Sequence, residues 1–233
     1  MKILAVGDSW FDYPELLLTG GGVPDHLSRI IGLPIENIAH HGDGSEVTLS
    51  LARRRAIENA LPADIILASM GGDDIAGDQF CLWLNDNEGQ GLAGAVDTRR
   101  LSAVLDLVCA VFLDLEEIRD DFAPGALIVT HEYDFPLASV LGQGVCNLGP
   151  WLQPSLQFCG WNDLNDQQTI VRGVLATFAA RMRNLPISNR IHVQTQGTLG
   201  INEWQNEIHP NRQGFQKIAA KFADALTPYL KNE

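Results

Sequence analysis

The stretch Ile-Leu-Ala-Val-Gly-Asp-Ser at residues 3–9 decides the fold class. Its four apolar residues are typical of a short strand that is buried on both faces, and the glycine and the polar pair behind them end the strand in a turn. The same kind of unit recurs along the chain. Apolar runs that predict further strands lie at residues 35–39, 64–70, 126–130 and 190–195.

Segments with helical spacing alternate with these strands. They lie at residues 25–31, 46–60, 98–122, 166–184 and 211–230. In the last of them, apolar residues recur every three or four positions from Phe215 to Tyr229, which predicts one buried stripe. The alternation of short buried strands with amphipathic helices predicts an α/β fold in which a parallel sheet is covered on both faces.

The composition fits one α/β domain over residues 1–233. Hydrophobic residues make up 45% of the chain and charged residues 19%, so a core of real size is available without a metal or a disulfide. The net charge of −13 argues against nucleic acid and anionic membranes as partners. No segment has the length of a membrane span, and no signal segment precedes the first strand. We therefore expect a cytoplasmic protein, or a secreted one if a signal peptide has been removed.

The four cysteines show neither CxxC nor cysteine–histidine spacing, so no metal site is expected. Cys146 and Cys159 flank one long loop, and the sequence leaves open whether they form a disulfide. This loop, at about residues 132–165, has no clear periodicity and is expected as an insertion in the domain. Its aromatic residues either wall a substrate pocket or form a small core of the loop itself. They are Tyr133, Phe135, Trp151, Phe158 and Trp161.

Four polar clusters are candidates for a functional site. They are Gly-Asp-Ser at residues 7–9, Gly-Asp-Gly-Ser at 42–45, Gly-Gly-Asp-Asp at 71–74 and Asn-Glu-Ile-His-Pro at 206–210. The first three follow the first three predicted strands, and the fourth lies in the loop before the final helix. Because ligands of an open parallel sheet bind beyond the carboxyl ends of its strands, these clusters together predict one site at that edge.

Ser9 and His209 are the candidate nucleophile and base. Directly after the first strand, the hydroxyl of Ser9 would stand at the open edge, where it needs a neighbouring base to take its proton. His209 alone among the six histidines lies in an Asn-x-x-His-Pro context between a loop and a helix. The others are interpreted as structural, and His131 is the least secure of them because it ends the fourth strand on the same edge. These others are His26, His40, His41, His131 and His192.

A glycine after the second strand lets a backbone N–H approach a developing oxyanion without hindrance from a side chain. Gly44 is the candidate for this role and Gly42 is the alternative, although the same residues would also make an ordinary turn.

In their order and placement, the four clusters resemble the conserved blocks of SGNH (GDSL) hydrolases. The resemblance extends from residue 7 to residue 210 and implies a three-layer α/β/α, flavodoxin-like sandwich with a central, mostly parallel five-stranded sheet. It also implies hydrolysis of carboxylic esters through an acyl-enzyme without a cofactor. The implied substrates are small-molecule, lipid or acetylated-sugar esters.

The resemblance implies a role for each candidate residue. Ser9 attacks the carbonyl carbon, His209 removes its proton, and Asn206 orients the imidazole. The N–H groups of Ser9 and Gly44 hold the oxyanion, with Asp73 in the position of a third donor. The aromatic candidates for substrate binding are Trp10 and Trp151. From their place directly after the nucleophile, Trp10, Phe11 and Tyr13 either shape the acyl pocket or pack in the core.

Two residues depart from the family pattern, since Asp73 replaces an asparagine and Asn206 replaces an aspartate. Loss of one oxyanion donor costs about 10²–10³ in rate, and an aspartate-to-asparagine change in a serine triad costs about 10⁴. Because the two changes are opposite in kind, one hypothesis is that the pair has exchanged chemistry. Asp73 would then be protonated and donating, or its carboxylate would support His209 from another side. Glu207 and Glu203 are the other candidates for the missing acid.

Two functions of other classes compete with this interpretation. A non-catalytic binding protein of the same fold would explain both departures, whereas the presence of Ser9 and His209 speaks against it. A phosphoryl site could hold Mg²⁺ with Asp8, Asp73 and Asp74, but no lysine ends a late strand as a phospho-receiver would require. Nucleotide binding is disfavoured because neither GxGxxG nor a Gly-Lys-Ser/Thr loop is present.

Overall fold

Five parallel strands form the central sheet in the computed structural model, which describes residues 1–14, 19–89, 91–145 and 148–230. Their order across the sheet is β2-β1-β3-β4-β5, and every neighbouring pair is parallel. The strands are β1 (Ile3–Gly7), β2 (Ile35–Asn37), β3 (Ile65–Ser69), β4 (Leu127–His131) and β5 (Arg190–Val193). The parallel sheet predicted from the sequence is confirmed.

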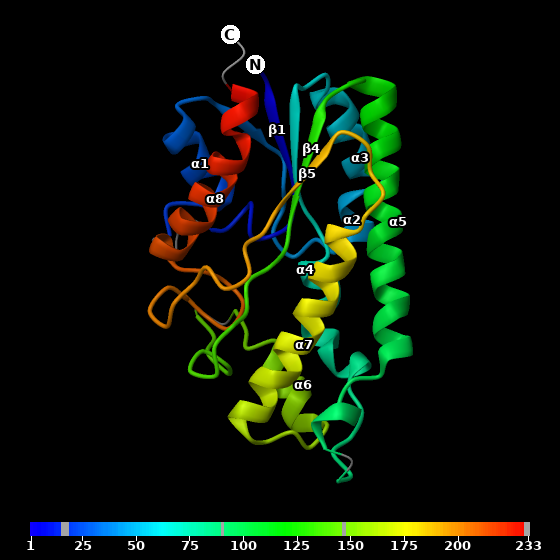
Figure 1. The fold of residues 1–233 in the computed structure, drawn as a ribbon, viewed down its shortest axis with the longest axis vertical. Helices are drawn as coiled ribbons and strands as arrows, with labels where there is room; N and C mark the ends of the chain where they lie inside the picture. Colours follow the sequence, from blue (N-terminus) through cyan, green and yellow to red (C-terminus); the bar gives the residue numbers. More distant parts are fainter. Residues whose placement is uncertain (15–18, 90, 146–147, 231–233) are drawn as a thin grey trace.

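Helices cover both faces of the sheet (Figure 1). Helices α1 and α8 pack against each other on one face, and α3, α5 and α7 lie on the other, which gives the three layers of an α/β/α sandwich. The α-helices are α1 (Val23–Ile31), α2 (Ser45–Thr48), α3 (Leu51–Ala60), α4 (Gly72–Ala76), α5 (Thr98–Phe122), α6 (Leu152–Phe158), α7 (Leu164–Arg183) and α8 (Arg212–Leu230). Two 3₁₀ helices, η2 (Asp78–Trp83) and η3 (Leu92–Gly94), lie between α4 and α5.

The core lies where the middle of the sheet meets the two helical layers. All residues of β1, β3 and β4 are buried, as expected for strands covered on both faces. On α8, the predicted apolar stripe is buried through Phe215, Ile218, Phe222 and Leu226. Within the described residues, no helix is both long and apolar enough to cross a membrane.

The single helix predicted at residues 46–60 is wrong, because the chain forms α2 and α3 with a break between them. Ser45 is held at the sheet edge by Asp74, which accepts hydrogen bonds from its N–H at 2.8 Å and from its hydroxyl at 2.7 Å. Ser50 has an extended backbone and starts α3, where its carbonyl accepts from the N–H of Arg54 at 2.7 Å. The break therefore follows from a tertiary anchor on Ser45 and from a new helix start at Ser50.

Residues 132–165 are not a structureless insertion, because they contain the short helix α6. The carboxylate of Glu207 accepts hydrogen bonds from the N–H groups of Leu152 at 2.7 Å and Gln153 at 2.8 Å, at the first turn of this helix. A helix started by a residue more than fifty positions away leaves no local signal in the sequence. Cys159, at the end of this segment, has a free thiol, and Cys146 lies outside the described residues.

Candidate active site

The turn after β1 carries Ser9 to the carboxyl edge of the sheet. Gly7 has a φ of +135°, and a Cβ atom there would lie 1.9 Å from the carbonyl oxygen of Ser69 on β3. Only glycine lets the chain pass so close to the neighbouring strand, and the N–H of Asp8 donates to the same oxygen at 2.9 Å. Ser9 then comes at the wall of a pocket beyond the strand ends.

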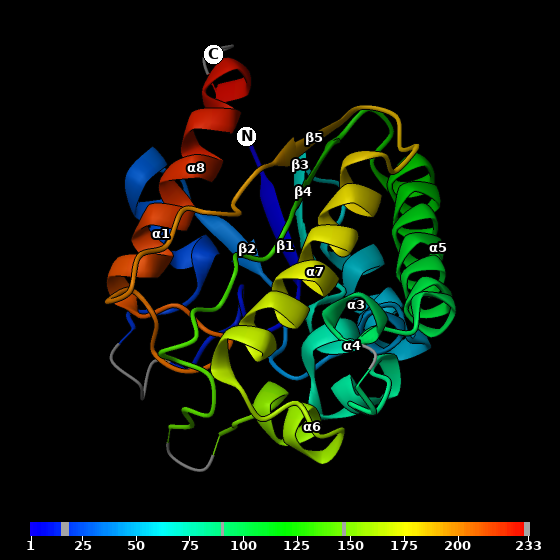
Figure 2. The same cartoon turned by 60° about the horizontal axis from the view of Figure 1, so that its bottom comes forward.

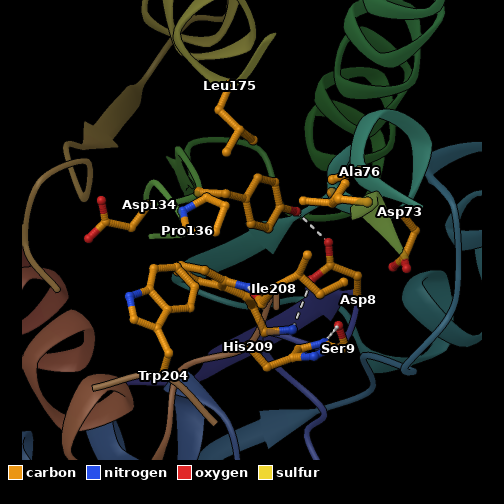
Figure 3. Close-up of a pocket in the computed structure, with 14 residues that line it drawn as sticks. Asp8, Ser9, Asp73, Ala76, Asp134, Pro136, Leu175, Trp204, Ile208 and His209 are labelled. Atoms are coloured by element: carbon orange, nitrogen blue, oxygen red, sulfur yellow. Dashed lines mark hydrogen bonds between the residues drawn. The ribbon is translucent and has the colours of Figure 1, made fainter. Parts of the chain in front are cut away.

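Ser9 and His209 lie within hydrogen-bonding distance although 200 positions separate them in the sequence. The Oγ of Ser9 is 2.7 Å from the Nε2 of His209 (Figure 3). Both side chains are nearly buried and line the same pocket. The structure thus brings the predicted nucleophile and base together in the geometry that proton transfer between them requires.

Asn206 fixes the tautomer of this histidine. Its Oδ1 accepts hydrogen bonds from the N–H of Ile208 at 3.2 Å and the N–H of His209 at 2.9 Å, and it lies 3.0 Å from the His209 Nδ1. Its Nδ2 donates to the hydroxyl of Tyr13 at 3.0 Å, which places the amide oxygen toward the ring. Because an amide oxygen only accepts, the Nδ1 carries the proton and the Nε2 lone pair faces Ser9.

Burial lowers the pKa of His209 to about 3. No carboxylate of the described chain forms a hydrogen bond to its ring, whose partners are Ser9 and Asn206. The histidine is therefore neutral at physiological pH and is a weak base.

Neither glutamate proposed as the missing acid supplies one, so that prediction is wrong for both. Glu207 is fully buried and turns its carboxylate to backbone N–H groups at the start of α6, including those of Trp151 and Leu152. Glu203 accepts from the N–H of Gly200 at 2.6 Å and pairs with Lys217 at 2.5 Å. Both carboxylates stabilise loops around the site and leave His209 without charge support.

Asp8, next to the nucleophile, lines the pocket and is anchored by hydrogen bonds. Its Oδ1 accepts from the hydroxyl of Ser69 at 2.7 Å and the N–H of Trp10 at 3.1 Å, and its Oδ2 accepts from the hydroxyl of Tyr133. Burial raises the pKa of Asp8 to about 6, against the effect of these three donors. His131 reaches the same cluster, with its Nε2 2.9 Å from the Ser69 Oγ, and does not line the pocket.

The two acidic residues after β3 have different surroundings. Asp74 is buried and bound to Ser45, as described above. Asp73 lines the pocket that contains Ser9, and its Oδ2 is buried without a hydrogen-bond partner in the described chain. No group of three or more potential ligands able to hold a metal ion is found among the described residues. The arrangement gives no support to a Mg²⁺ site at Asp8, Asp73 and Asp74.

Two hollows meet at Asp73. One is a small pocket that contains Ser9 and His209. Its apolar walls are Trp10, Ala76, Pro136, Leu152, Leu175, Trp204 and Ile208. The other is a wider groove along α2, α4 and η2. Its acidic lining residues are Glu46, Asp73, Asp74 and Asp78, and none of its lining residues is basic.

The predicted oxyanion glycine lies on the groove side of Asp73. Gly44 and Gly42 both line the groove, and neither lines the pocket with Ser9. Within the described residues, the N–H groups of Ser9 and Gly44 donate to no protein acceptor, so both remain available to a ligand. Gly44 therefore carries an unpaired N–H in the groove that also contains Asp73, and its role at an oxyanion stays a prediction.

The predicted aromatic residues take several different places. Trp10 lines the pocket, and Trp151 lines the groove with its ring centroid 5.3 Å from that of His209, edge to face. Tyr133 also lines the pocket, whereas Phe158 is 82% exposed and Trp161 is buried away from both hollows. Phe11 and Tyr13 are buried outside the pocket lining, and Tyr13 packs against the imidazole of His209 with 4.5 Å between ring centroids.

No protein-family model matches the chain, and no curated protein matches it by sequence. Among solved structures, it is similar to a lipase from a goat rumen metagenome, with a TM-score of 0.62 at 14% identity over 97% of both chains. It is also similar to an SGNH hydrolase from Slackia heliotrinireducens, with a TM-score of 0.53 at 17% identity over 97% of this chain and 98% of that one. The chain has the SGNH hydrolase fold.

The SGNH fold is also found in a carbohydrate esterase of family 3 from Talaromyces cellulolyticus. This enzyme has a TM-score of 0.54 to the chain at 13% identity, over 100% of this chain and 99% of that one. At such identities the likeness shows the fold, and the chemistry of the site must be argued from the residues of this chain. The flavodoxin-like three-layer architecture implied by the resemblance is confirmed.

Sequence patterns gave no sign of several hydrogen bonds that hold the site in the SGNH fold. Tyr13 orients Asn206, and Ser69 and Tyr133 anchor Asp8. Ser69 and Tyr133 lie at or just after the carboxyl ends of β3 and β4, so their place along the strands was the one available signal. The contact between Tyr13 and Asn206 joins positions 193 apart, which no local spacing could reveal.

Proposed function

We propose that this chain is a serine hydrolase that cleaves carboxylic esters through an acyl-enzyme. The observation that carries the proposal is the 2.7 Å contact between the Ser9 Oγ and the lone-pair nitrogen of His209, whose tautomer Asn206 fixes. A hydroxyl in hydrogen-bond contact with an oriented neutral imidazole, at the wall of an apolar pocket, is the arrangement that activates serine as a nucleophile.

In the first step, the Ser9 Oγ bonds to the carbonyl carbon of the ester while its proton passes to the His209 Nε2. The electron pair of the carbonyl double bond moves onto oxygen, where the free N–H of Ser9 can donate to it. When the tetrahedral species collapses, the bond to the leaving alcohol breaks and His209 gives its proton to that alcohol. Water then attacks the acyl-enzyme by the same route in reverse, and no cofactor takes part.

The acyl group is assigned to the apolar pocket and the alcohol to the groove. The pocket opens directly beside Ser9 and His209, and its walls are mainly apolar, which suits a hydrocarbon chain. The groove is wider and lined by carboxylates, so it disfavours alcohols that carry phosphate or other negative charge. The proposed substrates are therefore small, lipid or acetylated-sugar esters with a neutral leaving group.

Covalent labelling tests the nucleophile without any knowledge of the natural ester. An alkyl fluorophosphonate should bond through phosphorus to the Ser9 Oγ with loss of fluoride, and mass spectrometry of the digested protein should place the adduct on the peptide with Ser9. Heat-unfolded protein and the Ser9→Ala variant are the controls, and neither should be labelled. A folded protein that stays unlabelled at high reagent excess would favour the non-catalytic binding protein.

Replacing Leu175 with alanine should shift the acyl-chain preference toward longer esters. Leu175 lies on α7, is nearly buried and points into the pocket (Figure 3). Its truncation enlarges the acyl pocket, at a stability cost of about 2–5 kcal/mol. The measurement is kcat/KM for nitrophenyl esters of increasing chain length, compared with wild type.

Leu115→Ala is the matched control for this experiment, because Leu115 is equally buried on α5 and lies outside the pocket lining. It should lose similar stability with no change in chain-length preference. The same shift in both variants, or no shift in Leu175→Ala, would contradict the assignment of the acyl group to this pocket.

A further inference from the structure

We propose that Asp73 works as a neutral carboxylic acid that donates a hydrogen bond from its O–H to the oxyanion formed at Ser9. The inference deepens the proposed ester hydrolysis and rests on it. An ionised carboxylate at this place would repel the oxyanion, whereas a protonated one adds a donor at the wall of the pocket that holds the nucleophile.

The distribution of hydrogen-bond donors places the proton on Asp73. Asp8 accepts from three groups, the Ser69 hydroxyl, the Tyr133 hydroxyl and the Trp10 N–H, and Asp74 accepts two hydrogen bonds from Ser45. The Oδ2 of Asp73 is buried and receives none in the described chain. When three crowded carboxyl groups share fewer than three charges, the charges stay where donors stabilise them, so the proton stays on the group without donors.

The charged and titratable groups around Asp73 also favour its protonated form. Burial, followed by the charges of Asp8, Asp74 and Asp43, raises the pKa of Asp73 from its ordinary value of 3.8 to about 8. Glu46 and Asp78 line the groove beside it, and Tyr133 and His209 line the pocket. The guanidinium of Arg53 pairs with Asp43 at 3.0 Å. Among the described residues, no lysine or arginine lines either hollow, so none of them competes there with the proton for Asp73.

The unpartnered O–H has a use only when a ligand is bound. The buried Oδ2 of Asp73 has no partner in the described chain, and a carbonyl oxygen entering the pocket beside Ser9 can accept from an O–H at this atom. In Figure 3 the carboxyl group of Asp73 and the hydroxyl of Ser9 lie on the same side of the pocket. During attack, the proton of Ser9 passes to His209, and the proton of Asp73 remains on Asp73 and is shared with the oxyanion.

Asn206, beside His209, is consistent with this role of Asp73. With an amide beside His209 and an acid beside the oxyanion, neither Asn206 nor Asp73 adds a negative charge to the site, and the charge of Asp8 is stabilised by its three donors. The positive charge that His209 gains in the transition state is then offset by the oxyanion itself, across a short distance in a mainly apolar pocket. The two unusual residues thus form one arrangement, in which the acid supports the oxyanion and the amide sets the tautomer.

The dependence of rate on pH tests this role. The wild type should hydrolyse nitrophenyl acetate well below pH 7, and kcat/KM should fall about tenfold per pH unit above about pH 8 as Asp73 loses its proton. Asp73→Asn should keep activity at pH 7 within about tenfold of wild type and lose this alkaline fall, because an amide donates at every pH. Asp73→Leu, which cannot donate, should lose about 10² in rate and approach the uncatalysed reaction.

The pH dependence of the unfolding free energy, measured without substrate, tests the protonation of Asp73 separately. The folded state holds the Asp73 proton more tightly than the unfolded state does. As pH rises from about 4 to about 8, the free energy of unfolding of wild type should therefore fall relative to that of Asp73→Asn. Above about pH 8 the difference between the two proteins should stay constant. The control is Asp121→Asn, which removes an exposed aspartate on α5 and should show no such trend.

A stability difference that is independent of pH between 4 and 9 would overturn the protonation of Asp73. A pH-dependent difference together with an unchanged alkaline limb in Asp73→Asn would overturn its role at the oxyanion. If wild type neither hydrolyses esters nor reacts with the fluorophosphonate at Ser9, the proposed function fails and this role fails with it. If the label attaches to Ser9 and Asp73→Leu is as active as wild type, only the role of Asp73 is wrong.

Discussion

Replacing Ser9 with alanine is expected to lower the rate of ester hydrolysis by about 10² or more, to the level of the uncatalysed reaction in the same buffer. Removal of the serine from a complete triad costs about 10⁶ in kcat, and an aspartate-to-asparagine change in such a triad costs about 10⁴. The rate advantage that remains, about 10², is what Ser9 can supply when an asparagine supports His209. The measurement is kcat/KM on nitrophenyl acetate with wild type and variant prepared side by side.

His209→Ala should give the same loss, and the double variant should be no slower than either single variant. Ser9 and His209 act as one unit through a single proton transfer, so their contributions do not add. Ser9 is nearly buried, and its Oγ hydrogen-bonds the His209 ring, so Ser9→Ala should remain folded with a small loss of stability. Folding is checked by circular dichroism. If folded Ser9→Ala keeps the wild-type rate, then Ser9 is not the nucleophile.

Replacing Asn206 with aspartate is expected to raise kcat/KM by about 10² at pH 7. The substitution keeps the three hydrogen bonds that Oδ1 accepts from Ile208 and His209, and the Tyr13 hydroxyl can donate to the new carboxylate in place of accepting. A carboxylate at Nδ1 raises the pKa of His209 and stabilises the imidazolium formed in the transition state. Because Asn206 is fully buried, desolvation of the new charge should keep the gain below the full factor of about 10⁴.

The pH dependence of kcat/KM shows in which direction Asn206→Asp changes the pKa of His209. In wild type, burial lowers the pKa of His209 to about 3, so the base form is present down to that pH and the acid limb should lie near it. In Asn206→Asp the acid limb should move to higher pH, because the imidazole then takes up its proton earlier. Asn206→Leu is the matched control of similar size, and it should lose activity because no acceptor fixes the tautomer. A folded Asn206→Asp that is no faster than wild type would mean that the basicity of His209 does not limit the rate.

The acidic groove and the apolar pocket meet at one residue, which gives Asp73 an influence on both halves of the substrate. It lines the pocket beside Ser9 and also the groove beside Gly44 and Trp151. Substitutions at Asp73 are therefore best compared with one small ester, because a larger alcohol would add effects of the groove to those at the oxyanion. Nitrophenyl acetate satisfies this condition for all of the rate measurements above.

The sequence by itself determined the α/β class, the parallel sheet and the edge at which the candidate residues gather. Those features follow from local patterns, since short apolar runs predict buried strands and the spacing in residues 211–230 predicts the buried stripe of α8. The closeness of Ser9 and His209 was also within reach, because both were placed beyond the carboxyl ends of the strands. Figure 2 shows this end of the molecule turned forward, with α4, α6 and the loops around the site.

Only the tertiary structure decided which partner each acidic side chain takes. Glu207 and Glu203 stand close to His209 in the sequence, yet their carboxylates turn to the start of α6 and to Lys217. Asp73 and Asp74 are neighbours, yet Asp74 is bound to Ser45 and the Oδ2 of Asp73 has no donor among the described residues. The protonation of a carboxyl group depends on burial and on donors from distant segments, and local sequence carries no record of either.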